Sequence, residues 1–319
     1  MLKMKFPIFL LLLIHFMVGN SFSAPNPADT MSPEKAIQYY ESILKRNKHS
    51  SYALYGIAAT YFIEKNYQKS LKFSKYNTDE PNDYRAESYI LYASSLDRMG
   101  RLSEAIDIYE KALKSYPDNY QLCYEYSLSC YKYRKYNKAL PAINRAIALQ
   151  PLFVPAHYLN GCLLFESAND QRCIPVFLFA LLLDNDSLRS QQAIAFINEY
   201  LKHNMTNINI PFLGTRFSII TVDNILYYYI FQKTKNEVYS SLKFENLCGI
   251  IDDYLNSTKD FTAEYQQFYS SLAANKFTGV FSHYVLRMSD NEYIKRWYIL
   301  HKDQLSQFAE FLNKNLPGK

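Results

Sequence analysis

The sequence predicts an all-α protein in which a solenoid of helical hairpins is followed by an α-helical C-terminal domain. The first observation is a repeat, because from Ala86 to Pro151 one order of aromatic, small and proline residues occurs twice, 34 residues apart. The second is composition, since the chain of 319 residues has only 8 glycines and scarce helix breakers favour helices. The third is the recurrence of apolar residues at helical spacing along most of the chain.

The N-terminal residues predict an export signal that is no part of the fold. Two lysines precede an apolar run of 13 residues, 6–18, and small polar residues follow it. We expect cleavage after Ser23, with Ala24 as the alternative. The run is shorter than the roughly 20 apolar residues that span a bilayer. The sequence therefore predicts a signal peptide over residues 1–23, a periplasmic or secreted protein and no stable membrane insertion after cleavage, while an uncleaved anchor stays open.

Charge and cysteine content argue against two classes of protein. Removal of the signal leaves 33 of the 35 basic residues against 30 acidic ones, a balance that argues against a dedicated nucleic-acid-binding protein. The cysteine count is odd, and no pair has the C-x-x-C spacing of a redox or metal site. We expect small, buried apolar cysteines, although two of them fall on the two helices of one hairpin. The five are Cys123, Cys130, Cys162, Cys173 and Cys248.

The helices are predicted to begin after a short proline-containing lead. Ser32, Pro33 and Glu34 are typical of a helix start, with a hydroxyl cap, proline at the first position and an acid in the first turn. One amphipathic helix follows as far as Leu44 and is expected to be either the end cap of the stack or the second half of an incomplete repeat. A first, weakly patterned hairpin then covers residues 51–85.

Three further hairpins and a closing helix complete the predicted solenoid, residues 32–202. The repeated stretch supplies two of them, the third covers residues 154–187, and a helix over residues 191–201 closes the array. Pro141 and Pro175 occupy the same position of successive hairpins, near the start of the second helix. Because proline removes a backbone donor, those helices are expected either to begin late or to bend.

The repeated stretch resembles the tetratricopeptide repeat family, whose unit is a pair of antiparallel helices. The likeness extends more weakly over residues 32–187. Small residues let the two helices approach closely, so Ala93 is expected to meet Ala105, and Gly161 to meet Cys173. The residues that carry the pattern are Tyr89, Tyr92, Ala93, Gly100, Ala105, Tyr109, Ala112 and Pro117, followed by Cys123, Tyr126, Ser127, Arg134, Ala139, Ile143, Ala146 and Pro151.

The last third of the chain predicts a separate helical domain. Residues 203–221 lack a helical period and contain asparagine, proline and glycine, which predicts a linker or a long loop. Residues 222–319 are helical again but fit no register of 34 residues. The expected helices cover residues 222–242, 244–255, 262–273, 280–288 and 291–312.

The resemblance implies that the first helix of each hairpin lines a concave groove. An aromatic groove favours an extended or helical peptide with apolar anchors; packing within the protein is the alternative role of these side chains. The family's charged clamp for a C-terminal carboxylate has no counterpart in the chain. The predicted groove residues are Tyr52, Tyr55, Phe62, Ile90, Arg98, Tyr124, Tyr131, Lys132, Tyr158 and Phe165, with Asp97 beside Arg98.

The sequence contains no motif that predicts catalysis. It has no H-E-x-x-H, no G-x-S-x-G and no glycine-rich phosphate loop, so we expect no enzyme, no cofactor and no metal site. The favoured function is a non-enzymatic scaffold that binds another polypeptide in the groove, in envelope assembly or secretion. Two alternatives stay open: a self-assembling structural component, that is a homo-oligomer, and an enzyme with a site between the two halves.

Overall fold

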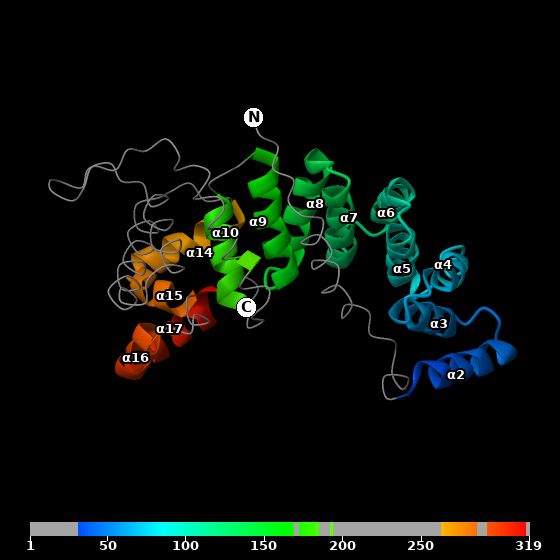
Figure 1. Cartoon of the computed structure of the whole chain (residues 1–319), viewed down its shortest axis with the longest axis horizontal. Helices are drawn as coiled ribbons and strands as arrows, with labels where there is room; N and C mark the ends of the chain where they lie inside the picture. Colours follow the sequence, from blue (N-terminus) through cyan, green and yellow to red (C-terminus); the bar gives the residue numbers. More distant parts are fainter. Residues whose placement is uncertain (1–30, 169–171, 185–191, 194–262, 286–291, 317–319) are drawn as a thin grey trace, which may run out of the picture. The chain divides into compact units, whose positions relative to one another are not determined.

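A computed structural model describes residues 31–168, 172–184, 192–193, 263–285 and 292–316 (Figure 1). Every regular element in these residues is a helix, so the all-α prediction is confirmed. Contacts divide the chain into two compact units, Met1–Leu149 and Gln150–Lys319. None of the described helices is long and apolar enough to cross a membrane. The predicted signal peptide and the predicted linker both lie outside the described residues.

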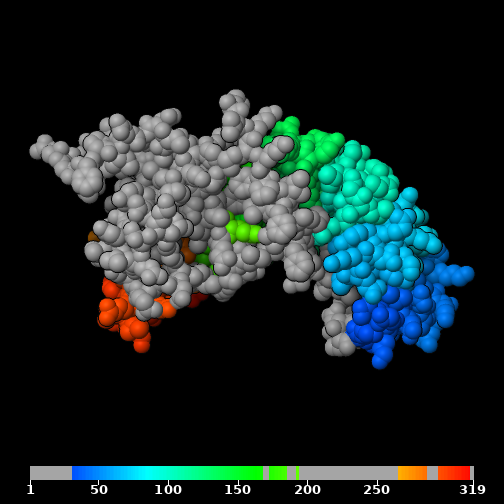
Figure 2. Space-filling model, viewed as in Figure 1, coloured from blue at the N-terminus to red at the C-terminus, as the bar shows by residue number. Residues whose placement is uncertain are grey.

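The first unit consists of one helix followed by three hairpins. Its helices are α2 (Pro33–Arg46), α3 (Ser51–Ile63), α4 (Tyr67–Tyr76), α5 (Arg85–Arg98), α6 (Leu102–Ser115), α7 (Tyr120–Lys132) and α8 (Tyr136–Leu149). In the space-filling view, α2 to α6, coloured blue to cyan, form one continuous body (Figure 2).

Contacts between hairpins place the first helices on the inner side of the first unit. Within the hairpins, α3 packs against α4, α5 against α6 and α7 against α8. The first helices also contact one another, α3 with α5 and α5 with α7, whereas α4, α6 and α8 share no comparable contact. A stack whose first helices are close together and whose second helices are apart bends towards the first helices. Because α2 packs on α3, it takes the place of a preceding second helix.

Side-chain caps start three of these helices. The hydroxyl of Ser50 accepts a hydrogen bond from the amide of Ala53 at 3.4 Å, and asparagine side chains at residues 66 and 119 cap α4 and α7 in the same way. Ser32 precedes α2 as predicted, but its side chain makes no cap hydrogen bond. The backbone of Glu34 and the Ser32 side chain instead hold the pKa of the Glu34 carboxyl below its usual value.

The three hairpins of the first unit share one turn. Lys65, Gly100 and Arg134 have φ angles of 62°, 79° and 55° and end the first helix of each hairpin. The amide after each bonds the carbonyl five residues before it, at 2.8 to 2.9 Å, as from Arg101 to Leu96. This is the left-handed helix end that glycine favours. Its recurrence fixes the same reversal of the chain in each hairpin.

The second unit joins the last predicted hairpin to the C-terminal helices. Its described helices are α9 (Val154–Ala168), α10 (Cys173–Leu183), α14 (Ala263–Ala274), α15 (Thr278–Val285), α16 (Glu292–Leu300) and α17 (Lys302–Asn315). The ring of Phe179 on α10 lies 5.3 Å from that of Tyr265 and 5.0 Å from that of Phe268 on α14. The hydroxyl of Tyr269 donates to the carbonyl of Pro175 at 2.6 Å. Aromatic side chains therefore bind the hairpin α9–α10 to α14.

The C-terminal helices agree with the prediction in part. The helix expected over residues 262–273 is α14, and the one over 280–288 overlaps α15. The segment 291–312 forms two helices, α16 and α17, because the chain turns at His301, where φ is −118°. The Trp297 carbonyl accepts hydrogen bonds from the backbone amide of His301 at 3.0 Å and from the imidazole Nδ1 of the same residue at 2.8 Å. The helices expected over residues 222–255 lie outside the described ranges.

Close contacts of small residues differ from the expectation in one place. Ala93 and Ala105 are both fully buried, as the pattern requires. At Gly161, however, a Cβ atom would lie 2.5 Å from the ring of Phe177, so the nearest neighbour of this glycine is an aromatic ring and not Cys173. Gly56 on α3 has the same relation to Tyr40, whose ring would lie 2.3 Å from a Cβ atom.

Pro141 and Pro175, for which a late helix start or a bend was predicted, lie at different places in their helices. Pro175 is the third residue of α10, so this helix begins late, whereas Pro141 lies inside α8.

The cysteine prediction is confirmed for four residues, which are free and buried; Cys248 lies outside the described part. Burial raises the pKa of the Cys130 thiol to about 11.

Candidate functional site

The predicted groove residues lie in both units. Eight are on α3, α5 and α7 of the first unit, and Tyr158 and Phe165 are on α9 of the second. Tyr52, Arg98 and Lys132 are half-buried, and the other seven are buried. The seven are Tyr55, Phe62, Ile90, Tyr124, Tyr131, Tyr158 and Phe165.

The aromatic residues on α3 pack against neighbouring rings. Tyr84, the residue before α5, lies 5.3 Å from Tyr55 in a stacked arrangement and 6.0 Å from Tyr52. Tyr52 also meets Tyr40 of α2 edge-on at 5.5 Å. Tyr84, at the start of the next hairpin, thus packs against two predicted groove residues. Sequence reasoning missed it because it precedes the helix whose periodicity was used.

Charged side chains connect the first helices of two hairpins. The ammonium of Lys132, at the end of α7, is paired with the carboxylate of Asp97 near the end of α5. Only 11% and 7% of these two side chains is exposed. The guanidinium of Arg98 lies 5.8 Å from the centre of the Phe62 ring on α3. The structure therefore brings together four side chains that the repeat register placed on the inner face: Phe62, Asp97, Arg98 and Lys132.

A fourth charged residue, Glu125, interacts with these three charged side chains. Glu125 on α7 is buried, with 5% of its surface exposed, and it precedes Lys132 by two helical turns. Its carboxylate interacts electrostatically with Asp97, Arg98 and Lys132. We call Asp97, Arg98, Glu125 and Lys132 the inner ionic cluster. The signal that sequence reasoning passed over is a carboxylate in the middle of a predicted buried helix face, seven residues from a lysine.

Burial sets the ionisation of this cluster. It raises the pKa of Glu125 to about 7; the negative charge of Asp97 adds to the effect, and Lys132 and Arg98 oppose it. Burial also lowers the pKa of Lys132, against the attraction of Asp97 and Glu125. The cluster thus contains one carboxyl, that of Glu125, whose pKa lies near neutral pH.

The second unit contains a buried histidine that has a structural role. His157 on α9 bonds the Tyr265 hydroxyl through Nδ1 at 2.7 Å and the Pro151 carbonyl through Nε2 at 2.8 Å. Burial lowers its pKa to about 4, so the imidazole is neutral. In the part of the chain that the structure describes, no three histidine, cysteine or acidic side chains are grouped to hold a metal ion. The side chains of Asp97, Glu125 and Lys132 in the inner ionic cluster are thus largely buried and interact with one another.

Comparison with known proteins identifies the repeat. The tetratricopeptide repeat model matches residues 86–129, which run from α5 into α7. No curated protein matches the sequence.

Solved helical-repeat structures are similar to this chain at low identity. MamA from Desulfovibrio magneticus RS-1 is 16% identical and has a TM-score of 0.44, over 54% of this chain and 94% of that one. YrrB, described as a TPR protein with an unusual peptide-binding site, is 14% identical, with a TM-score of 0.42 over 57% and 95% of the two chains. The C-terminal part of a TPR repeat-containing protein from Cytophaga hutchinsonii is 13% identical, with a TM-score of 0.46 over 90% and 98%. These TM-scores lie below 0.5, so the likeness is not evidence of what this chain binds.

Proposed function

Because its repeated segment is a tetratricopeptide repeat, we propose that this protein is a non-enzymatic scaffold that binds another polypeptide along its first helices. The inner ionic cluster carries the proposal. Replacing a buried ion pair by apolar side chains is often neutral or stabilising, so such a pair is weak evidence of a role in stability. A charged pair between consecutive first helices suits recognition of a polypeptide, whose backbone and charged side chains need donors and acceptors.

The neighbouring rings define what else the partner must offer. Tyr131 lies on α7 together with two members of the cluster, and Tyr52 and Phe62 lie on α3, the first helix of the first hairpin. Tyrosine and phenylalanine give large contact areas with little conformational entropy to lose. The partner that fits is an extended or helical segment with apolar anchors and at least one charged or strongly polar group. Envelope assembly and secretion are the processes in which we place this binding.

Site-specific cross-linking tests the proposal. We would replace Tyr52 or Arg98 by a photoreactive benzoylphenylalanine in the full chain and irradiate the producing cells. The matched control carries the same group at Tyr133, which follows α7, is 48% exposed and is not a predicted groove residue. We expect covalent adducts with a different polypeptide from the two inner positions and none from the control.

Two results would contradict this function. Adducts from Tyr133 alone would place the interaction on another surface. Adducts between two copies of this chain would support the self-assembling component instead. Both are read directly from the mass of the cross-linked product.

We also propose that the protein is exported and that residues 1–23 are removed. The supporting feature is the order of basic, apolar and small polar residues at the N-terminus. N-terminal sequencing of the protein isolated outside the cytoplasm should begin at Ala24 or Pro25. A protein that begins at Met1, or that stays in the cytoplasm, would refute cleavage or export respectively.

A further inference from the structure

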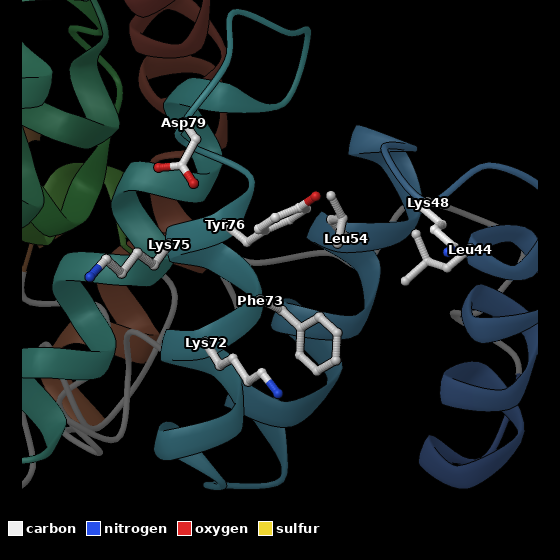
Figure 3. A pocket seen from close by; sticks show the side chains of 8 residues that line it. All are labelled: Leu44, Lys48, Leu54, Lys72, Phe73, Lys75, Tyr76 and Asp79. Atoms are coloured by element: carbon white, nitrogen blue, oxygen red, sulfur yellow. The ribbon is translucent and has the colours of Figure 1, made fainter.

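A hollow of about 500 Å³ lies between α2 and α4 of the first unit (Figure 3). Its apolar lining consists of Leu44 on α2, Leu54 on α3 and Phe73 and Tyr76 on α4. In Figure 3, Leu44 projects from α2 towards the side of the hollow formed by Phe73 and Tyr76. The predicted groove residues lie on first helices, whereas α2 and α4 occupy second-helix positions. The hollow is therefore a different surface from the inner ionic cluster.

Ring contacts hold the wall of the hollow in place. Phe73 stacks on Tyr61 of α3, with the ring centres 6.0 Å apart. Tyr76 stacks with His49 at 6.1 Å, and its hydroxyl lies 3.2 Å from the Nδ1 atom of that imidazole. Tyr76 nevertheless stays 47% exposed. Such a preformed apolar surface costs little conformational entropy when a side chain enters it.

Three lysines surround this apolar lining. Lys48, Lys72 and Lys75 line the hollow and are exposed, together with a single acid, Asp79. Among the described residues, none of the three ammonium groups forms an ion pair. Cations on α8 behave differently. Lys138 pairs with Glu110 at 2.7 Å, and a similar pair joins Arg145 of α8 to an aspartate.

The segment that supplies the lining of this hollow has an excess of positive charge. Residues 44–79 contain seven lysines and arginines against two acids, a net charge of +5, which equals the formal net charge of all 319 residues. Stabilisation of a helix C-terminus accounts for Lys75, which lies in the last turn of α4. It does not account for Lys72 in the middle of α4 or for Lys48 beyond the end of α2. Three unpaired cations around one apolar hollow complement a ligand that is apolar at its centre and anionic at its edges.

We propose that this hollow is a second docking site, which binds an acidic segment of a partner polypeptide through an apolar anchor of one or two residues. The anchor enters between Leu44, Phe73 and Tyr76, and the flanking carboxylates meet Lys48, Lys72 and Lys75. A nucleic acid fits less well, because phosphates would meet only the three lysines that line the hollow, and a phosphate backbone has no group that matches its apolar centre. A membrane surface fits less well, because peripheral proteins insert protruding apolar side chains and this apolar surface is recessed.

Binding of synthetic peptides to the full chain tests this site. The probe is a short fluorescein-labelled peptide with glutamates on both sides of a central Leu-Phe pair, and its affinity is measured by fluorescence anisotropy. Matched peptides carry glutamine for each glutamate, or serine for the Leu-Phe pair. We expect the first peptide to bind, both matched peptides to bind at least roughly tenfold more weakly, and added salt to weaken the interaction.

Charge reversal separates the site from a general effect of net charge. The variant K48E/K72E/K75E should lose at least roughly tenfold in affinity for the acidic peptide. The control K35E/K114E/K314E has the same change in charge at three exposed lysines that do not line the hollow and should bind as the original protein does. Tyr76→Ala should weaken binding of the acidic peptide and should not affect the serine peptide. Far-UV circular dichroism of every variant checks that the helices are retained.

Several results would overturn the proposal. These are equal losses in the two triple variants, unchanged binding after K48E/K72E/K75E, or no binding of the acidic peptide to the folded protein. The same conclusion follows if phosphatidylserine vesicles or a single-stranded oligonucleotide depend on the three lysines and the peptide does not. Cross-linking from Tyr52 or Arg98 should be unchanged in K48E/K72E/K75E, so this site and the groove can fail independently.

Discussion

Glu125 is the residue whose ionisation should control the stability of the first unit. Its carboxyl is buried and has a pKa of about 7, against 4.5 for the unperturbed group. At a pH between these two values, Glu125 is protonated in the folded protein and has lost its proton in the unfolded chain. The free energy of unfolding therefore falls as the pH rises from about 4.5 to about 7, and the stability that Glu125 contributes is complete only below this range.

Glu125→Gln should remove this fall in the free energy of unfolding with rising pH, because glutamine stays neutral. We expect the variant to exceed the original protein in free energy of unfolding by about 1–3 kcal/mol at about pH 8 and by little at about pH 5. Urea unfolding at both pH values measures the difference. Glu41→Gln, which removes an exposed carboxyl on α2, serves as the control and should leave the pH dependence unaltered. Equal pH dependence of the original protein and Glu125→Gln would refute the assignment.

Pro141 is a second residue whose local chemistry gives a definite expectation. It lies exposed inside α8, where it removes one backbone hydrogen bond and buries no side chain in return. Pro141→Ala should therefore raise the free energy of unfolding by roughly 1–3 kcal/mol. Pro175→Ala is the matched control, because Pro175 is buried and lies in the first turn of α10, where its missing amide has no helical partner. Urea unfolding should show a gain for the first variant and none for the second; the reverse order would contradict this account.

At the scale of helices, the first unit depends on a glycine beneath an aromatic ring. Gly56 on α3 meets the Tyr40 ring of α2, and an added Cβ atom would lie 2.3 Å from it. Alanine is the better helix former by about 1 kcal/mol, but the overlap should make Gly56→Ala destabilising by roughly 1–3 kcal/mol. A double-mutant cycle with Tyr40→Leu tests the cause, since the smaller side chain should recover part of the loss. Strict additivity of the two changes would mean that this contact is not the reason.

The hairpins could be predicted wherever close approach requires small residues. Ala93 and Ala105 are such a pair, and their spacing around Gly100 repeats in the next hairpin. The pair α14–α15 has the same turn, because Lys276 has a φ of 59° and the amide of Phe277 bonds the Leu272 carbonyl at 3.0 Å.

In the hairpin α14–α15, aromatic residues occupy the positions at which the repeat pattern has small residues. At the two positions that correspond to Ala93 and Ala105 stand Tyr269 and Phe281, whose rings meet edge-on with centres 5.8 Å apart. The turn depends on backbone conformation, which lysine can adopt at a cost, and the space between the helices is filled by rings. No pattern of small residues was left to detect.

The candidate site was predictable only to the level of helix faces. The repeat register placed Asp97, Arg98 and Lys132 on first helices, and the structure pairs the first with the last. The repeat register could not predict which of these side chains pair, because the distance between two side chains on successive hairpins depends on how far the stack bends. The hollow beside Tyr76 was missed for a related reason, since its lining comes from three helices and its three lysines look like ordinary surface residues in the sequence.

At the scale of the molecule, the repeat array and the compact units do not coincide. The repeat pattern runs through α9–α10, yet this hairpin belongs to the unit that contains the C-terminal helices. Contacts of Phe179 with α14 and the hydrogen bond that the Tyr265 hydroxyl donates to His157 explain why. Stability in helical repeats is transmitted between neighbours that share an interface, so a division at residue 149 predicts two steps of unfolding.

Trp297 makes these two steps separately observable. It is the only tryptophan of the chain and lies on α16 in the second unit, stacked between His283 at 4.0 Å and His301 at 4.4 Å. Its fluorescence therefore reports unfolding of the second unit, whereas far-UV circular dichroism reports both. In urea, Gly56→Ala should shift part of the dichroism transition and leave the fluorescence midpoint unchanged.

Gly161→Ala is the matched change in the second unit, because a Cβ atom there would meet Phe177 at 2.5 Å. This variant should move the fluorescence midpoint to lower urea, by an amount that corresponds to roughly 1–3 kcal/mol. If either substitution shifted both signals together, the two units would unfold as one cooperative block. Interfaces across the division would then have to be as strong as those within each unit, and the hairpin α9–α10 would belong energetically to the array that precedes it.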